Sequence, residues 1–233
     1  MYVNRIYEAD NQHKTCNKSR DFSLLLFIER GQETSMAKGT EYTLTDGQKE
    51  RLRNKIILGA KNFDTYLNDR CFKIVCEDNS ETIVRFFQRD FQHLTGLRSN
   101  LSTKDFYDKC LNRTISTGNI DSNQKYNWST LKSKSDRIEI IHELLYTDAD
   151  KTLLLNDLTV RTGNLPVAIR NDERKTCVGF MDTINRARSL RKSSTSQNAK
   201  EEKTIIAIYG KKNGDVEFAD IIYEKKSTTS SSS

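Results

Sequence analysis

The alternation of apolar and polar positions is most regular over residues 45–69. Apolar side chains recur there at spacings of three and four, with Lys, Arg and Asn between them, at Leu52, Ile56, Ala60, Phe63 and Leu67. This is the period of an α-helix that buries one face. Thr45 or Asp46 is suited to cap its first turn, because either side chain accepts hydrogen bonds from free backbone N–H groups. A long amphipathic helix is therefore predicted.

Shorter patterns predict a hairpin and two more helices. Runs of β-branched and aromatic residues at 72–75 and 82–87 flank the turn-forming residues 77–80, which is typical of a β-hairpin. Residues 102–105 resemble a capping box and predict a helix that continues through Leu111. Apolar residues at helical spacing predict another helix over residues 136–146. The polar residues 112–134 between these helices are expected to form a long loop.

The last third of the chain consists of strand-like runs. Asn, Asp and Gly separate these runs, which occupy residues 152–158, 166–169, 175–181, 204–209 and 216–223. Asn213-Gly214 predicts a type I′ hairpin turn between the last two. The basic, Ser-rich residues 186–203 are expected to form a mobile loop or a short helix. Helices first and strands last predict an α+β fold, with N-terminal helices packed on an antiparallel sheet of about four to six strands.

Polarity divides the chain into three parts. Residues 1–40 show no sustained period, and Met36-Ala-Lys-Gly39 reads like the start of a bacterial protein, so this part is expected to be an N-terminal extension. Residues 41–226 form the predicted α+β domain. Residues 227–233 are only Ser and Thr, too polar to pack, and are expected to be disordered.

Charge and cysteine usage limit the function classes. The 38 Lys and Arg residues exceed the 32 Asp and Glu residues, which favours polyanions modestly and fits a merely solvated basic surface equally well. The five cysteines are scattered without zinc-ligand spacing, as in a reduced cytoplasmic protein. The apolar run of residues 24–28 is far too short to span a membrane. No glycine-rich phosphate-binding motif occurs, and no cofactor is expected.

Histidine is the first candidate for chemistry, and the chain has three. His13 lies in the expected extension, and His142 lies on the apolar face of its predicted helix, where a core role is expected. His93 lies after a strand and directly before the sequence Leu94-Thr-Gly96, a setting in which loops present reactive groups. An imidazole can act as base or acid in RNA cleavage without a metal. A purely structural hydrogen bond from His93 to the backbone remains the alternative.

Hydroxyl and cationic side chains in two segments can complete such a site. The segment after His93 offers Thr95, Lys104, Tyr107 and Lys109. A second, basic segment combines guanidinium, ammonium and hydroxyl groups that suit phosphate, at Arg186, Arg188, Ser189, Arg191 and Lys192. A solvated charged loop explains this segment equally well. Asp148, Asp150 and Asp157 form no recognised ligand motif, so no metal is expected.

Residues 91–96, 102–111, 204–209 and 221–223 together resemble the phage-associated nuclease-like family grouped with barnase, EndoU, colicins E5 and D, and RelE. The resemblance covers about residues 61–223. It implies helices packed on an antiparallel sheet and metal-independent cleavage of RNA, often tRNA. By matching motif it nominates His93, then Thr95 and Lys104, and after them Arg188 and Ser189. No second histidine is well placed, so the general acid remains unassigned.

The function expected from these observations is a phage- or mobile-element-encoded ribonuclease in the cytoplasm of a bacterial host. Its substrate would be host tRNA or a defence-system RNA such as a guide RNA. The alternative is a non-catalytic, anti-CRISPR-like inhibitor that binds a host defence ribonucleoprotein. A toxin that needs an antitoxin is a third interpretation. The expected partners are RNA and a CRISPR effector or another host defence protein, without a membrane.

Overall fold

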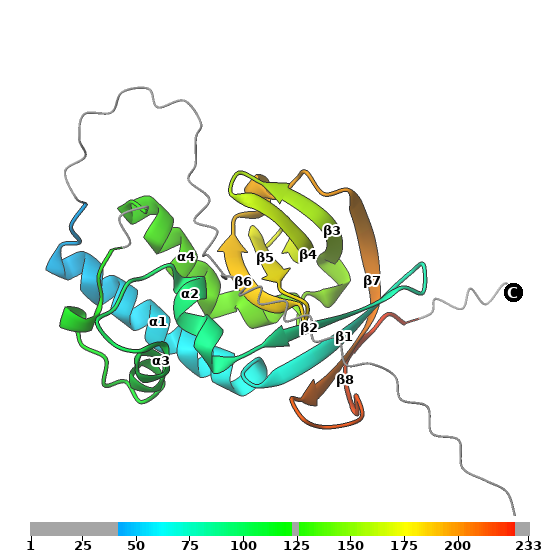
Figure 1. Cartoon of the computed structure of the whole chain (residues 1–233), viewed down its shortest axis with the longest axis horizontal. Helices are drawn as coiled ribbons and strands as arrows, with labels where there is room; N and C mark the ends of the chain where they lie inside the picture. The colour runs from blue at the N-terminus through cyan, green and yellow to red at the C-terminus, as the bar shows by residue number, and fades with distance from the viewer. Residues whose placement is uncertain (1–41, 123–125, 227–233) are drawn as a thin grey trace, which may run out of the picture. The chain divides into compact units, whose positions relative to one another are not determined.

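A computed structural model describes residues 42–122 and 126–226, which fall within one compact unit (Figure 1). The predicted extension of residues 1–40 and the predicted tail of residues 227–233 lie outside the described residues. So does His13. In the described part, no helix is long and apolar enough to cross a membrane.

Four α-helices and eight strands make up the described chain. The α-helices are α1 (Asp46–Tyr66), α2 (Phe91–Thr95), α3 (Thr103–Leu111) and α4 (Trp128–Ile140). The strands are β1 (Arg70–Cys76), β2 (Glu81–Phe86), β3 (Thr152–Val160), β4 (Gly163–Asn171), β5 (Thr176–Met181), β6 (Arg186–Arg191), β7 (Glu201–Lys212) and β8 (Asp220–Glu224). Five short 3-10 helices are η1 (Gln88–Asp90), η2 (Thr117–Asn119), η3 (Ile141–Leu144), η4 (Ala149–Lys151) and η5 (Ser193–Thr195).

The strands form a closed sheet, so the expected antiparallel sheet of four to six strands is wrong. The order is β1-β2-β6-β5-β4-β3-β7, and β7 pairs back with β1 to close a seven-stranded barrel, with β8 added to β7. The pairing of β2 with β6 is parallel, which makes the barrel mixed. Closure depends on the length of β7: its first residues pair with β3 and the rest with β1. Such long-range pairing leaves no local pattern in the sequence.

Two local predictions in the last third are also wrong. Residues 186–191 form strand β6, paired with β5, rather than a loop. The segment looks polar because only Ala187 and Leu190 of its residues are buried. The last two strands do pair antiparallel as predicted, but Asn213-Gly214 is not a two-residue turn between them, since β7 ends at Lys212 and β8 begins at Asp220. Instead, the backbone N–H of Asn213 donates to the Asp69 carbonyl at 2.9 Å and holds this loop against the end of α1.

Several helix predictions are confirmed, and one is corrected. Thr45 caps α1 in a capping box with Gln48. The five apolar residues predicted to face inward, the last of which is the C-cap Leu67, are all buried. Ser102 caps α3 by accepting a hydrogen bond from the Asp105 backbone at 3.1 Å. However, α4 begins at Trp128 within the supposed loop of residues 112–134, and Asn127 caps it. Beyond Ile140 the chain continues as a 3-10 helix rather than as the predicted α-helix.

The helices lie together on one side of the strands (Figure 1). One large hydrophobic core joins helices to sheet, and Phe63 of α1 lies inside it. Its ring makes edge contacts with Phe86 of β2, Phe91 of α2 and Tyr107 of α3, with centroids 5.4 to 6.1 Å apart. This cluster fixes the short helix α2 against the sheet.

Candidate functional site

The C-terminal end of α2 presents His93. Buried Phe91 and Leu94 anchor the helix, while His93 is exposed on its outer side. The helix ends at Gly96, whose φ of 73° is the left-handed conformation that glycine adopts without strain. An added Cβ on Gly96 would also lie 2.7 Å from Cδ of Lys134. Gly96 therefore allows both the sharp end of α2 and the close approach of Lys134 from α4.

Three elements meet around His93, because α2 contacts both α4 and β6, and α4 also contacts β6. From β6, Arg188 affects the imidazole through both its backbone and its guanidinium charge. Lys134 of α4 and Arg186 of β6 act on the ring as further positive charges. We call His93, Lys134, Arg186 and Arg188 the His93 cluster.

The pKa of His93 is lowered from its usual value of 6.5. The main cause is burial of the ring by neighbouring elements, even though the residue keeps solvent-exposed surface. The positive charges of Arg188 and Lys134 act in the same direction, whereas a hydrogen bond to the Arg188 backbone opposes them. The imidazole is therefore neutral near pH 7 and able to accept a proton.

Lys134 is largely removed from water. Its Nζ donates to the Leu190 carbonyl at 2.8 Å and lies 5.3 Å from the centroid of the Tyr126 ring. Burial, together with the positive charges of Arg191 and Arg137, lowers the pKa of Lys134 to about 8. A lysine with such a pKa keeps its proton at neutral pH but can release it to a reacting group.

Arg186 is held by a buried carboxylate. Its Nε lies 3.2 Å from Oδ1 of Asp90, which is fully buried in η1 just before α2. Burial raises the pKa of Asp90 from 3.8 to about 6, although Arg186, the Phe87 backbone and Arg188 counteract this shift. Arg188 itself forms no ion pair within the described part of the chain. Its charge is therefore free to meet an anionic ligand.

Asp90 should give the protein a measurable pH dependence of stability. Because its pKa is higher in the folded chain, the folded state binds this proton more tightly than the unfolded state. The contribution of Asp90 to the free energy of unfolding is complete below about pH 4. It falls by about 3 kcal/mol as the pH rises through about 6. Asp90→Asn should lack this decline when urea unfolding is compared at the two ends of this range. A constant difference between variant and wild type would contradict the assignment.

Three of the remaining predicted residues, Ser189, Arg191 and Lys192, lie next to the His93 cluster. Ser189 accepts a hydrogen bond from Nε of Arg191 at 2.8 Å, and Arg191 also donates to the Thr162 hydroxyl. Lys192 is exposed at the end of β6. The basic segment of residues 186–192 is thus brought to His93, as an ordered strand.

Other predicted residues have different surroundings. Thr95 is fully buried, where its hydroxyl donates to the Gln92 carbonyl at 2.6 Å. Tyr107 is also buried, and its hydroxyl donates to Asp64 at 2.9 Å. Lys104 is exposed on α3 and pairs with Asp108 at 2.6 Å, while Lys109 is half-buried on the same helix. None of the hydrogen bonds or ion pairs of these side chains joins them to β6.

Helix α4 supplies cations that the sequence analysis missed. The sequence pattern predicts a loop over residues 112–134 and the next helix only from residue 136, which assigns Lys134 and Arg137 to different elements. Both belong to α4, where they face β6 and the β4–β5 turn. The signal that would have located them is the cap at Asn127 followed by Leu131, Ser135 and Ile138, the buried side chains of α4.

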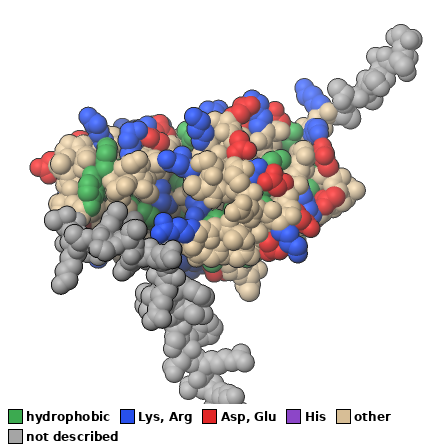
Figure 2. Space-filling view, turned by 90° about the horizontal axis from the view of Figure 1, so that it is seen from above, with side chains coloured by type: hydrophobic (Ala, Val, Ile, Leu, Met, Phe, Trp, Pro, Cys, Tyr) green, Lys and Arg blue, Asp and Glu red, His purple; other side chains and the backbone are tan. Residues whose placement is uncertain are grey.

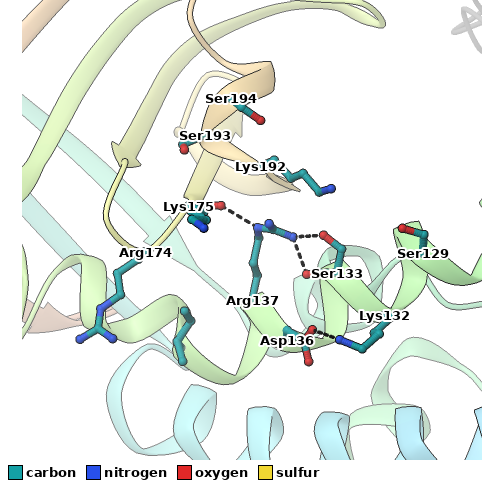
Figure 3. Close-up of a pocket in the computed structure, with 11 residues that line it drawn as sticks. Ser129, Lys132, Ser133, Asp136, Arg137, Arg174, Lys175, Lys192, Ser193 and Ser194 are labelled. Atoms are coloured by element: carbon teal, nitrogen blue, oxygen red, sulfur yellow. Dashed lines mark hydrogen bonds and ion pairs between the residues drawn. The ribbon is translucent and has the colours of Figure 1, made fainter.

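A hollow of about 640 Å³ lies between α4, the β4–β5 turn and the end of β6 (Figure 3). Arg137 reaches across it from α4, and Lys192, Ser193 and Ser194 lie on the opposite side. A second hollow of about 360 Å³ adjoins it and is lined by Lys134, Ser189 and Arg191. Figure 2 shows the molecule from above, and Lys and Arg side chains gather near the middle of this face. In the described residues, no group of three or more His, Cys, Asp or Glu side chains could hold a metal ion.

Comparison with known protein families gives a match over most of the chain. The model of a family described as phage-Barnase-EndoU-ColicinE5/D-RelE like nuclease matches residues 55–227. That range contains α2, α4 and β6, and therefore the whole His93 cluster. No curated protein and no solved structure matches the chain.

Proposed function

The chain belongs to this phage-type nuclease family, and from that premise we propose that it is a metal-independent ribonuclease in which His93 is the reacting base. The observation that supports this most directly is the exposed imidazole of His93 beside Arg188, whose guanidinium has no ion-pair partner in the described chain. RNA cleavage by attack of the 2′-hydroxyl on the adjacent phosphate requires a base that takes the hydroxyl proton. It also requires a cation that stabilises the negative charge on the phosphate.

In the proposed reaction, the 2′-oxygen of a ribose attacks the adjacent phosphorus. Neutral His93 takes the proton of the 2′-hydroxyl while the bond from phosphorus to the 5′-oxygen breaks. The 5′-oxygen leaves with a proton from an acid, so the products are a 2′,3′-cyclic phosphate and a 5′-hydroxyl. No water, metal or redox partner enters this step.

The cations around His93 have distinct proposed roles. Arg188 binds the non-bridging phosphate oxygens, whose negative charge grows in the transition state. Lys134 is the proposed proton donor, because the pKa of about 8 leaves it protonated at neutral pH. Arg186, fixed by Asp90, adds positive charge behind them.

The proposed substrates are host tRNA and defence-system RNA such as a guide RNA, in the cytoplasm of a bacterial host. The net charge of +6 and the cation-lined hollows beside His93 support a polyanionic partner. A CRISPR effector or another defence ribonucleoprotein is the proposed protein partner. Should the chain bind such a complex and leave its RNA intact, the non-catalytic inhibitor would be the better description.

The pH dependence of cleavage tests this proposal on total RNA and on guide-loaded effector. The rate should rise with pH as His93 loses its proton, because the pKa of His93 lies below the usual 6.5. It should fall again as Lys134 loses its proton near pH 8. Lys134→Arg, whose guanidinium keeps the positive charge but does not release its proton, should lower the maximal rate and remove the alkaline limb. EDTA should leave the rate unchanged, and products should carry cyclic phosphates. Inhibition by EDTA, or an alkaline limb that the variant leaves in place, would contradict the mechanism.

A further inference from the structure

The larger hollow has walls that suit an anionic chain. Its lining comes from α4, the β4–β5 turn and the start of η5, and consists mainly of cationic and hydroxyl side chains. Asp136 is its one acidic lining residue, and this carboxylate already pairs with Lys132 at 3.0 Å and with Lys55 at 3.7 Å. The field inside the hollow is therefore positive.

Three of the five cations that line the larger hollow are not neutralised by the described chain. Arg137 donates from Nε to the Lys175 carbonyl at 2.8 Å and from Nη1 to the Ser133 carbonyl at 2.5 Å, so its partners carry no charge. Lys175 and Lys192 are exposed and form no ion pair with any described carboxylate. Arg174, by contrast, is paired with Asp148 and Glu143. Three positive charges thus remain for a ligand.

The hollow is also preformed. The Lys175 carbonyl accepts from Arg137 of α4 and from the Ser193 backbone at 3.3 Å, which ties the β4–β5 turn to both neighbouring elements. Figure 3 shows Arg137 at the centre of this junction, with Lys192 facing it. A site whose walls are fixed in advance loses little entropy when it binds a ligand.

The larger hollow is continuous with the His93 cluster. The smaller hollow shares Ser129, Ser133, Arg137 and Lys192 with the larger one, and Lys134 lines the smaller one. Lys134 in turn packs against Gly96, three residues after His93 at the end of α2. A flexible chain that places one phosphate at His93 can therefore lay its next phosphates along both hollows.

We infer that these two hollows form a phosphate-binding groove for single-stranded RNA, which holds the substrate backbone to one side of the bond cut at His93. The inference rests on the proposed ribonuclease function and extends it, because it names the strand form and the residues that bind it. The two hollows, of about 640 and 360 Å³, are lined by cationic and hydroxyl side chains that can bind successive phosphates of one strand. Cationic grooves that follow the backbone are the usual device for binding single strands without regard to sequence.

The test compares the wild-type chain with the double variant Lys175→Gln/Lys192→Gln. Glutamine removes the charge but keeps an unbranched side chain at Lys175, whose φ is 50°. The matched control is Lys61→Gln/Lys212→Gln, which makes the same change at two exposed lysines that line neither hollow. The probe is a fluorescent 2′-O-methyl oligouridine, which binds but cannot be cleaved.

The groove variant should bind the probe roughly tenfold more weakly at moderate salt, and its plot of log Kd against log salt should be shallower by about 1.4, because two single-strand phosphate contacts are lost. The control should change neither value as much. Cleavage of a dinucleotide, which reaches only His93, should keep its kcat/KM, whereas cleavage of a long RNA should slow.

Equal effects of the two double variants, or tighter binding of duplex RNA than of the single strand, would overturn the groove. The binding assay is independent of catalysis, because its probe has no free 2′-hydroxyl. Absence of cleavage by wild type would therefore refute the ribonuclease and leave the groove to be judged by binding alone.

Discussion

Replacing His93 by alanine should reduce RNA cleavage by roughly 10²- to 10⁴-fold in kcat, the contribution that one general base usually makes. The imidazole is exposed, so its removal leaves the anchors Phe91 and Leu94 in place and the fold intact. A gel of total RNA and of guide-loaded effector, with equal amounts of wild type and variant, measures the loss. Binding of an uncleavable RNA should change far less than kcat, because Arg188 and Lys134 remain.

The control for this prediction is His142→Ala. His142 stacks on Tyr66 with ring centroids 4.5 Å apart and lies on η3, away from the His93 cluster. Its loss should lower stability and leave the pH profile of cleavage as in wild type. Undiminished cleavage by the His93 variant would exclude His93 as the base, and equal losses in both variants would point to a structural effect.

Local patterns predicted those parts of the fold whose stability is local. The capped helices α1 and α3 and the hairpin of β1 and β2 follow from apolar period, cap residues and turn residues within one segment. Closure of the barrel could not be predicted in this way. The pairs β1–β7 and β2–β6 join residues more than 100 positions apart. Strand β6 resembles a polar loop in sequence because four of its six residues are Arg or Ser.

The candidate site shows the same division. The family resemblance carried by residues 91–96 and 102–111 is confirmed. His93, which is nominated from its place before Gly96, is exposed, whereas Thr95 and Tyr107, nominated from the residues that follow it, are buried. Residues close to His93 in the sequence therefore pack in the protein interior and do not provide the cations around the imidazole. Those cations come from α4 and β6, which only the tertiary fold brings together.

The position of His93 depends on how firmly α2 is anchored. This helix is only five residues long, too short to be stable by its own hydrogen bonds. Its anchor is Phe91, whose ring contacts those of Phe63, Phe106 and Tyr107. Loss of this anchor should therefore affect both stability and cleavage.

Phe91→Ala should lower the free energy of unfolding by about 3–5 kcal/mol, the usual loss when a fully buried phenylalanine leaves a cavity. Urea unfolding monitored by circular dichroism measures it. Phe218→Ala is the matched control, since Phe218 is only half-buried in the β7–β8 loop and should lose much less. Phe91→Leu, which fills most of the cavity, should stay folded at assay temperature yet cut RNA more slowly, because His93 shifts against Arg188. Full activity of this variant would show that α2 is positioned without Phe91.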